Sequence, residues 1–402
     1  MTPYTGFVYF LVIIGLVFPM LVTSRFGKGT GPAWIAITTA FMLYLQYNTP
    51  LHLAPDLWIP EGFALVFFGI WQWALVRLAL SVKAMRKSWI LVPLSLLPLV
   101  VAKYMPFVLP DYKFGFIGIS YVTFRSLDVL WSITDGVLKE AGTLDLLVYL
   151  FFFPTIASGP IDRYRRFRAD FRRTRTWDEL LTDLDAGVPY IFRGLLYKYV
   201  IATLIEQHVL GHAEMGTYLH GAIYYAYVYS AHLFFDFAGY SAFAVGVSRW
   251  FGIRTPENFR LPWAAPNIKE FWNRWHISLS MWFRDHVYMR FVLTASKKKW
   301  FPNRDITSSV GYFVSFGLMG VWHGLTWYYI AYGLYHATLL AGYDAWLRWR
   351  KRHPDRFTAP RWKYVAHFIT INAVVAGLWL FSGHGYLTKE PPPPPEPVLQ
   401  EQ

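Results

Sequence analysis

The sequence contains no cysteine and few charged residues for its length. The absence of cysteine excludes disulfides, thiolate nucleophiles and metal sites with cysteine ligands. Charged residues make up 16% of the 402 residues, against about a quarter in an ordinary soluble domain. Acidic residues are the scarcer kind, 25 against 38 basic residues, which gives a formal net charge of +13.

Long apolar runs stand where a soluble chain would have charges. Residues 7–22 and 146–160 contain no charged side chain, and residues 308–340 contain only His323 and His336 as ionisable groups other than tyrosine. A helix needs about 20 apolar residues to cross a hydrocarbon core, so repeated runs of this kind predict a multi-span membrane protein. A soluble globular enzyme is excluded.

We expect an all-α, polytopic membrane protein with about 10 or 11 transmembrane helices. In the run at 114–133, Arg125 and Asp128 must face protein or water, so this segment should be buried, broken or re-entrant. The candidate spans are residues 7–22, 34–47, 62–80, 89–109, 114–133, 146–160, 191–210 and 218–248, the pair in 308–340, and residues 364–380.

One membrane domain is expected over residues 1–385, followed by a disordered, proline-rich tail over residues 386–402. Two stretches within the domain, 161–185 and 251–305, carry too many charges to be spans, so we expect them in the cytoplasm or at the interface. No internal repeat is visible.

Basic residues set the expected orientation. Residues 163–175 alone contain seven arginines, and further clusters lie at 297–299 and 348–352. Lysine and arginine are enriched in cytoplasmic loops, so these clusters should be cytoplasmic and the N-terminus extracellular. In a membrane protein such clusters attract anionic lipid, and nucleic-acid binding is not expected.

The first candidate for chemistry is His323, which lies with Trp322 in Gly320-Val321-Trp322-His323-Gly324. An ionisable residue inside an apolar run is costly and is therefore a functional candidate. A neutral imidazole can take a proton from an acceptor hydroxyl and later protonate a leaving group. The alternative is a structural histidine that bonds across helices.

The second candidate is His276. On a helix, Asn273, His276 and Ser280 would share one face and could present polar groups to a buried substrate. The alternative is an interfacial helix anchored by its tryptophans and arginines. Asp236 is a lone carboxylate among aromatic residues, which either orients an imidazole or bonds helix ends.

Familiar enzyme signatures are missing from the sequence. No His-Glu-x-x-His pair is present among the 12 histidines, so we expect no metal site. The serines lack the Gly-x-Ser-x-Gly pattern of a nucleophile elbow, which argues against serine hydrolase chemistry.

An apolar stripe with basic surroundings lies within residues 285–296. Met289, Val292 and Leu293 would fall on one face of a helix, and Arg290 and Lys297 are among the basic residues beside them. Such a surface would suit a small acidic partner with apolar contacts. Anchoring to anionic lipid is the alternative.

Several long strings together resemble the membrane-bound O-acyltransferase family, and within it the D-alanyl-transfer branch. They are Gly-Ile-Ser-Tyr-Val-Thr-Phe-Arg at 118–125, Ser-Gly-Pro-Ile-Asp-Arg at 158–163, Leu-Phe-Phe-Asp-Phe-Ala-Gly-Tyr-Ser at 233–241, the Trp-Asn-Arg-Trp-His region at 269–285, and Met-Gly-Val-Trp-His-Gly at 319–324. The resemblance covers the chain up to about residue 383, and the tail has no counterpart.

The resemblance implies an acyltransferase of the bacterial plasma membrane, with its helices in a ring around a thin central funnel. Its acyl donor would be D-alanine held as a thioester on the phosphopantetheine arm of an acidic carrier protein, and the chain itself would bind no cofactor. His323 would be catalytic, with His276 as the second such residue. Asp236, Asn273, Trp322 and Ser280 would support them.

The resemblance also implies partners. The carrier protein would dock at the segment of Met289, Val292, Leu293, Arg290 and Lys297. An extracellular transfer protein and a small membrane subunit would help to pass D-alanine to teichoic acid. Two alternatives remain open: O-acetylation of an exported polysaccharide, and a D-alanyl channel without covalent chemistry.

Overall fold

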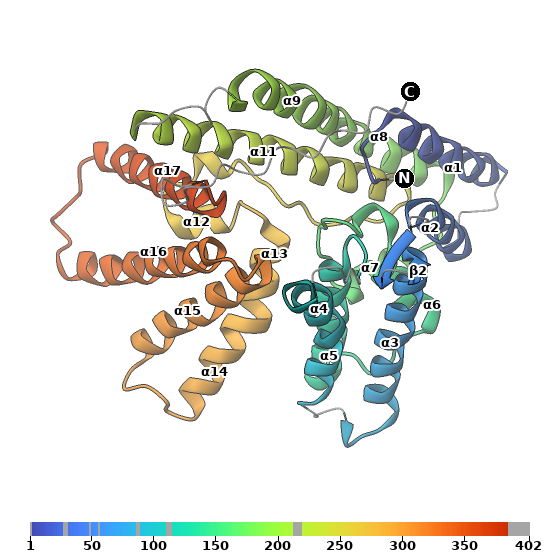
Figure 1. The fold of residues 1–402 in the computed structure, drawn as a ribbon, viewed down its shortest axis with the longest axis horizontal. Coiled ribbons are helices and arrows are strands. Elements are labelled where there is room, and N and C mark those ends of the chain that lie inside the picture. Colours follow the sequence, from blue (N-terminus) through green and yellow to red (C-terminus); the bar gives the residue numbers. More distant parts are fainter. Residues whose placement is uncertain are drawn as a thin grey trace. The chain divides into compact units, whose positions relative to one another are not determined.

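The computed structural model describes residues 2–26, 31–47, 50–54, 57–85, 89–109, 115–211 and 219–384. Helices dominate these residues, which confirms the all-α prediction (Figure 1). The elements are α1 (Phe7–Arg25), α2 (Pro32–Gln46), β1 (Pro50–Ala54), β2 (Leu57–Pro60), α3 (Glu61–Ser81), α4 (Leu91–Val108), α5 (Ile119–Thr134), α6 (Thr143–Phe151), η2 (Phe153–Thr155), α7 (Tyr164–Arg172), α8 (Trp177–Gly194), η3 (Leu195–Ala202), α9 (Thr203–Ile205), η4 (Glu206–Leu210), α11 (Leu219–Trp250), η5 (Pro262–Ala264), α12 (Ile268–Trp272), α13 (Ile277–Phe283), η6 (Arg284–Tyr288), α14 (Met289–Lys297), α15 (Arg304–His323), α16 (Trp327–Arg352) and α17 (Arg361–Phe381). The tail expected at 386–402 lies outside the described residues.

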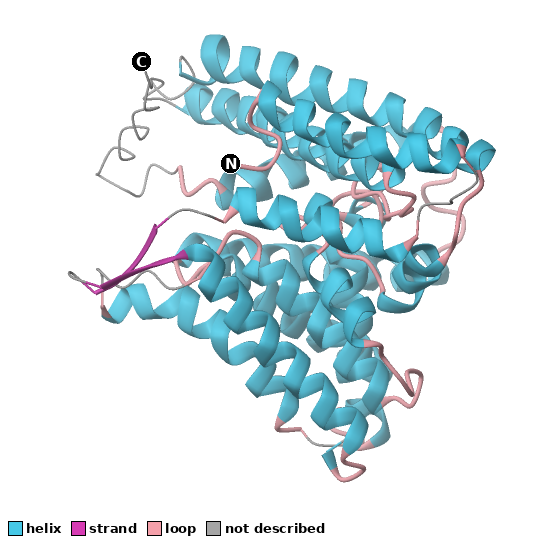
Figure 2. Cartoon of the chain, turned by 90° about the vertical axis from the view of Figure 1, so that its right-hand side faces the viewer, coloured by secondary structure: helices cyan, strands magenta, loops and turns pink. Residues whose placement is uncertain are grey.

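A short β-hairpin lies between the two expected spans at 34–47 and 62–80 (Figure 2). Strands β1 and β2 pair antiparallel, with Leu51 opposite Ile59 and His52 opposite Trp58. Runs this short carry little periodic signal, so the hairpin could not be recognised from the sequence pattern. It leaves the helical fold class unchanged.

Five helical segments of the described chain are long and apolar enough to cross a membrane. They are Phe7–Arg25, Glu61–Ser81, Leu91–Val108, Trp177–Leu210 and Arg361–Phe381. The other expected spans overlap helices α2, α5, α11, α15 and α16, whereas the span expected at 146–160 is helical only to the end of α6 at Phe151 and over η2. The chain is therefore a multi-pass membrane protein, and the total of 10 or 11 spans stays a prediction.

The chain divides into two compact units. Unit 1 consists of Met1–Val200, Phe235–Leu261 and Trp272–His286, and unit 2 consists of Ile201–Phe234, Pro262–Phe271 and Val287–Gln402. In unit 1, helix α5 packs against α3, α4, α6 and α7. The expectation of one domain over residues 1–385 stays a prediction.

A buried arginine explains how unit 1 accommodates an interrupted helix. Arg125 on α5 is 1% exposed, as expected for this run. Its guanidinium donates hydrogen bonds to the main-chain oxygens of Tyr149 (3.1 Å), Leu150 (2.9 Å) and Thr155 (2.7 Å). Helix α6 ends at Phe151, so its last carbonyls have no partner within the helix. Arg125 supplies these donors where water is excluded.

In unit 2, α15 and α16 pack side by side, and two glycines allow their backbones to approach closely. A Cβ atom on Gly333 would lie 2.2 Å from the carbonyl oxygen of Phe316, and one on Gly320 would lie 2.5 Å from that of Tyr329. Any larger residue would force the helices apart. This pairing positions the end of α15, where His323 lies.

Candidate functional site

His323 is the last residue of α15 in unit 2. Gly324 follows it in an extended conformation, and α16 begins three residues later at Trp327. The turn returns the chain along α15 and brings α16 against the imidazole. The packing of α15 on α16 thus places His323 at a helix junction, where its ring is half-buried.

Aromatic rings surround the imidazole of His323. The ring centroids of Trp322 and Phe381 lie 4.4 and 4.9 Å from it, and those of Tyr329 and Tyr332 lie 5.8 and 6.2 Å away. We call these four residues the aromatic cup. They come from α15, α16 and α17, so three helices of unit 2 hold the ring.

The aromatic cup determines what His323 can do. A neutral imidazole is the form that accepts a proton, and here its ring is held by aromatic side chains from three helices. The arrangement suits a general base that acts on a hydroxyl group.

His276 lies in unit 1, and its backbone is left-handed, with φ 44° and ψ 50°. Residues other than glycine adopt this conformation rarely, so the surrounding structure must hold it. Asn258 does so: its main-chain oxygen accepts from the nitrogen of Ile277 (2.9 Å), and its side-chain oxygen accepts from the Ser278 hydroxyl (2.6 Å).

This backbone contradicts the expectation that Asn273, His276 and Ser280 share one helical face. Helix α12 ends at Trp272, Asn273 lies in a turn, and α13 begins only at Ile277. The left-handed residue interrupts the helix and changes the direction of its side chain. The three polar groups therefore do not form a helical row, and their supporting roles stay predictions.

The side chain of His276 is buried, with 6% exposed. Its Nε2 atom lies 3.4 Å from the hydroxyl of Tyr121, and the ring of Phe237 packs edge-on at 4.7 Å. Burial lowers the pKa of His276 to about 3. His276 is thus neutral at physiological pH and suits a role as a hydrogen-bonding partner better than as a strong base.

Asp236 lies on α11 and forms an ion pair with Lys198 of η3. Both residues belong to unit 1, and the carboxylate is 42% exposed. Of the two interpretations of Asp236, this pair favours the link between helices over the orientation of an imidazole. A role in the reaction stays a prediction.

The expected docking stripe lies on α14 in unit 2. Met289 is 40% and Leu293 62% exposed, and Lys297 at the end of the helix is also exposed. Val292 instead lies half-buried against α15, so close to Gly311 that a Cβ there would be 2.8 Å from its Cγ2. Arg290 is half-buried as well. Met289 and Leu293 are therefore the apolar groups that α14 offers to a partner.

A polar network in unit 1 was not predicted. Asp128, 4% exposed, accepts hydrogen bonds from His286 Nε2 (2.9 Å) and from the Arg163 guanidinium (2.5 Å), and Arg163 also pairs with Asp285 (2.6 Å). The sequence did indicate that Asp128 needs partners, because a carboxylate inside an apolar run is costly without them. Its partners lie 35 and 158 residues away, so sequence spacing could not identify them.

Within the described residues, no group of three or more His, Asp or Glu side chains is placed to hold a metal ion. The chemistry that these side chains can supply is that of imidazole, carboxylate, hydroxyl and guanidinium groups.

The chain matches the model of the membrane-bound O-acyltransferase family over residues 28–381. It is 42% identical to the teichoic acid D-alanyltransferase of Bacillus subtilis, over 95% of this chain and 98% of that protein. It is 42% identical to the protein of that name from Streptococcus thermophilus, over 80% and 82% of the two chains, and 37% identical to that of Lacticaseibacillus rhamnosus, over 95% and 97%.

The family match spans both units and includes His276 and His323. It agrees with the resemblance that the sequence strings indicated, and with the helical, multi-pass architecture. The chain belongs to the membrane-bound O-acyltransferase family.

Proposed function

We propose that this chain transfers D-alanine from a carrier-protein thioester at the cytoplasmic side, for D-alanylation of teichoic acid outside the cell. One observation carries the proposal: the similarity to proteins named teichoic acid D-alanyltransferase extends over nearly the whole of both chains. A shared membrane scaffold alone would not require this agreement in length.

The reaction at His323 follows from acid–base chemistry. The neutral imidazole removes the proton from an acceptor hydroxyl, and the hydroxyl oxygen attacks the carbonyl carbon of the D-alanyl thioester. The tetrahedral intermediate then expels the phosphopantetheine sulfur, which takes the proton from the imidazolium. The products are a D-alanyl ester and a free thiol, and no acyl-histidine is needed.

The aromatic cup supports this role by holding the imidazole in one position. General base catalysis of this kind contributes about 10²- to 10⁴-fold to a rate. His276 supports the reaction as a hydrogen-bonding group, and its low pKa keeps its imidazole uncharged.

The carrier protein docks at α14, where Met289 and Leu293 are exposed and Lys297 provides positive charge for an acidic partner. The donor thioester on its phosphopantetheine arm is substrate, not a resident cofactor. An acidic substitution at Leu293 would place a charge in the apolar contact and repel the carrier.

The docking surface is tested with Leu293→Asp in the full-length protein. We expect carrier capture to fall by more than tenfold, while Leu261→Asp, which alters a residue 74% exposed in unit 1, leaves capture unchanged. Val292→Asp is a poorer test because that side chain also packs against α15. Equal capture by the Leu293 and Leu261 variants would refute docking at α14.

The proposed setting is the bacterial plasma membrane, with the N-terminus outside and the basic clusters inside, as the lysine and arginine distribution favours. A ring of helices around a central funnel would let the carrier's arm reach His323 from the cytoplasm. An extracellular transfer protein and a small membrane subunit would carry D-alanine on to the polymer.

The identity of the acyl donor distinguishes D-alanyl transfer from the two alternative functions. Proteoliposomes with the full-length protein are supplied with radiolabelled D-alanyl carrier or with an acetyl donor, and ester-bound label is measured. We expect label from the D-alanyl carrier alone. Label from the acetyl donor alone would indicate a polysaccharide O-acetyltransferase, and passage of D-alanine without any requirement for His323 would indicate a channel.

A further inference from the structure

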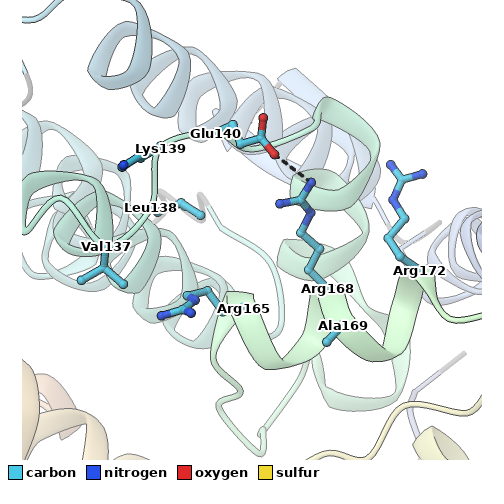
Figure 3. Close-up of a pocket in the computed structure, with 8 residues that line it drawn as sticks. All are labelled: Val137, Leu138, Lys139, Glu140, Arg165, Arg168, Ala169 and Arg172. Carbon is cyan, nitrogen blue, oxygen red and sulfur yellow. Dashed lines mark hydrogen bonds and ion pairs between the residues drawn. The ribbon is translucent and has the colours of Figure 1, made fainter.

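A basic cavity of about 760 Å³ lies in unit 1, between α7 and the loop that follows α5 (Figure 3). Its volume is that of a small-molecule site and is too small for a docked protein. It is separate from His276 and His323, and the proposed reaction does not use it. Its lining consists of Val137, Leu138, Lys139, Glu140, Arg165, Arg168, Ala169 and Arg172.

Helix α7 builds the basic wall of this cavity. Tyr164, Phe167 and Phe171 are at most 1% exposed and hold the helix to the unit. Arg165, Arg168 and Arg172 repeat at the same spacing on another side. The aromatic face thus fixes the helix and leaves three guanidinium groups around the cavity.

Charges within the cavity are only partly balanced. Arg168 pairs with Glu140 (3.3 Å, the dashed line in Figure 3) and with the buried Asp145 (3.0 Å), to which Arg172 also pairs (2.5 Å). Four cations face two carboxylates, which leaves an excess of two positive charges. Lys139 and Arg165 are exposed, and neither pairs with an acidic residue in the described part of the chain.

The cavity also has apolar lining. On the loop after α5, Val137 is 53% exposed and Leu138 is buried beside it, and Ala169 is exposed on α7. An inorganic anion would gain nothing from these groups, whereas an amphiphile could place its charge on Arg165 and Lys139 and its methylene groups on Val137. The chain is a multi-pass membrane protein, so a lipid is available at high local concentration.

We propose that this cavity binds the headgroup of an anionic phospholipid, with the phosphate between Arg165 and Lys139. Bound there, the lipid would complete the charge of α7 and hold the loop after α5 against the helix. The site is independent of the proposed D-alanyl transfer, because neither its residues nor its ligand takes part in that reaction.

The test uses delipidated, full-length protein in neutral detergent. Native mass spectrometry measures the affinity for phosphatidylglycerol and for phosphatidylcholine. The pocket variant carries Lys139→Gln with Arg165→Gln. The matched control carries Lys83→Gln with Arg260→Gln, which removes two exposed positive charges elsewhere in unit 1. Thermal unfolding confirms that both variants are folded.

We expect the pocket variant to bind phosphatidylglycerol about 30-fold more weakly, from the attraction that two basic side chains exert on an anionic headgroup. The control variant should bind it like the wild type, and phosphatidylcholine should bind weakly throughout. Equal weakening in both variants would mean diffuse charge attraction and would overturn the site. So would unchanged binding in the pocket variant.

A competition arm separates the two sources of a phosphate group. Inorganic phosphate is added at millimolar concentration to the complex with phosphatidylglycerol. We expect the lipid to stay bound, because inorganic phosphate makes no contact with Val137. Displacement of the lipid at this concentration would assign the cavity to free phosphate and contradict the lipid proposal.

Discussion

The substitution Arg125→Met gives a measurable test of how unit 1 is held together. Methionine keeps much of the side-chain volume but removes the donors to Tyr149, Leu150 and Thr155. Three buried carbonyl oxygens then lose their partner, and each loss costs about 1 kcal/mol or more. We therefore expect the free energy of unfolding to fall by about 3–5 kcal/mol, the sum of these three losses.

Equilibrium unfolding in mixed detergent micelles measures this loss by tryptophan fluorescence. Arg125→Lys should be intermediate, because one ammonium group cannot reach acceptors at both ends of the broken helix. Arg260→Met, at an exposed position, is the matched control and should change stability by less than about 0.5 kcal/mol. A loss below about 1 kcal/mol for Arg125→Met would refute the role given to this arginine.

Two further predictions concern the helix pair in unit 2 and the buried His276. Gly333→Ala should destabilise the protein by about 1–3 kcal/mol and reduce acyl transfer, because the new Cβ would collide with the Phe316 carbonyl. The control is Gly342→Ala on the same helix, which should be tolerated because a Cβ there meets nothing within 4 Å. An equal effect of the two in unfolding and transfer assays would contradict the close packing. The pKa of His276 is about 3 in the folded protein and about 6.5 in the unfolded chain. As the pH drops below about 6.5, the unfolded chain therefore binds a proton at His276 while the folded protein does not, and the free energy of unfolding falls. Asparagine tolerates a left-handed backbone, so His276→Asn should reduce the loss of unfolding free energy between pH 7 and pH 5 by about 2 kcal/mol. If unfolding titrations show the same acid sensitivity in this variant as in the wild type, His276 is not buried as described.

The apolar runs predicted most of the helices, because a segment that crosses the hydrocarbon core must be apolar and must satisfy its own backbone hydrogen bonds. That rule also predicted that Arg125 and Asp128 are buried. It could not identify their partners, since Arg163 and His286 come close to Asp128 only through the tertiary fold.

Local spacing failed where distant residues decide the backbone. Residues 273–280 have a helical pattern, yet Asn258 bonds to Ile277 and Ser278 and holds His276 in a left-handed conformation. The stripe on α14 met a similar limit. Its spacing groups Val292 with Leu293, but Gly311 on another helix leaves a gap that Val292 fills.

The central claim is that His323 acts as the base for D-alanyl transfer, and ester-bound D-alanine in the cell envelope tests it most directly. The assay compares four strains at equal membrane protein levels: wild type, His323→Ala, a deletion strain and a control, His353→Ala. His353 is a suitable control because its imidazole bonds to the main-chain oxygen of Trp349 in the preceding helix. We predict that His323→Ala falls at least 100-fold to the level of the deletion, while His353→Ala keeps the wild-type level. Normal D-alanine esters in the His323→Ala strain would contradict the account.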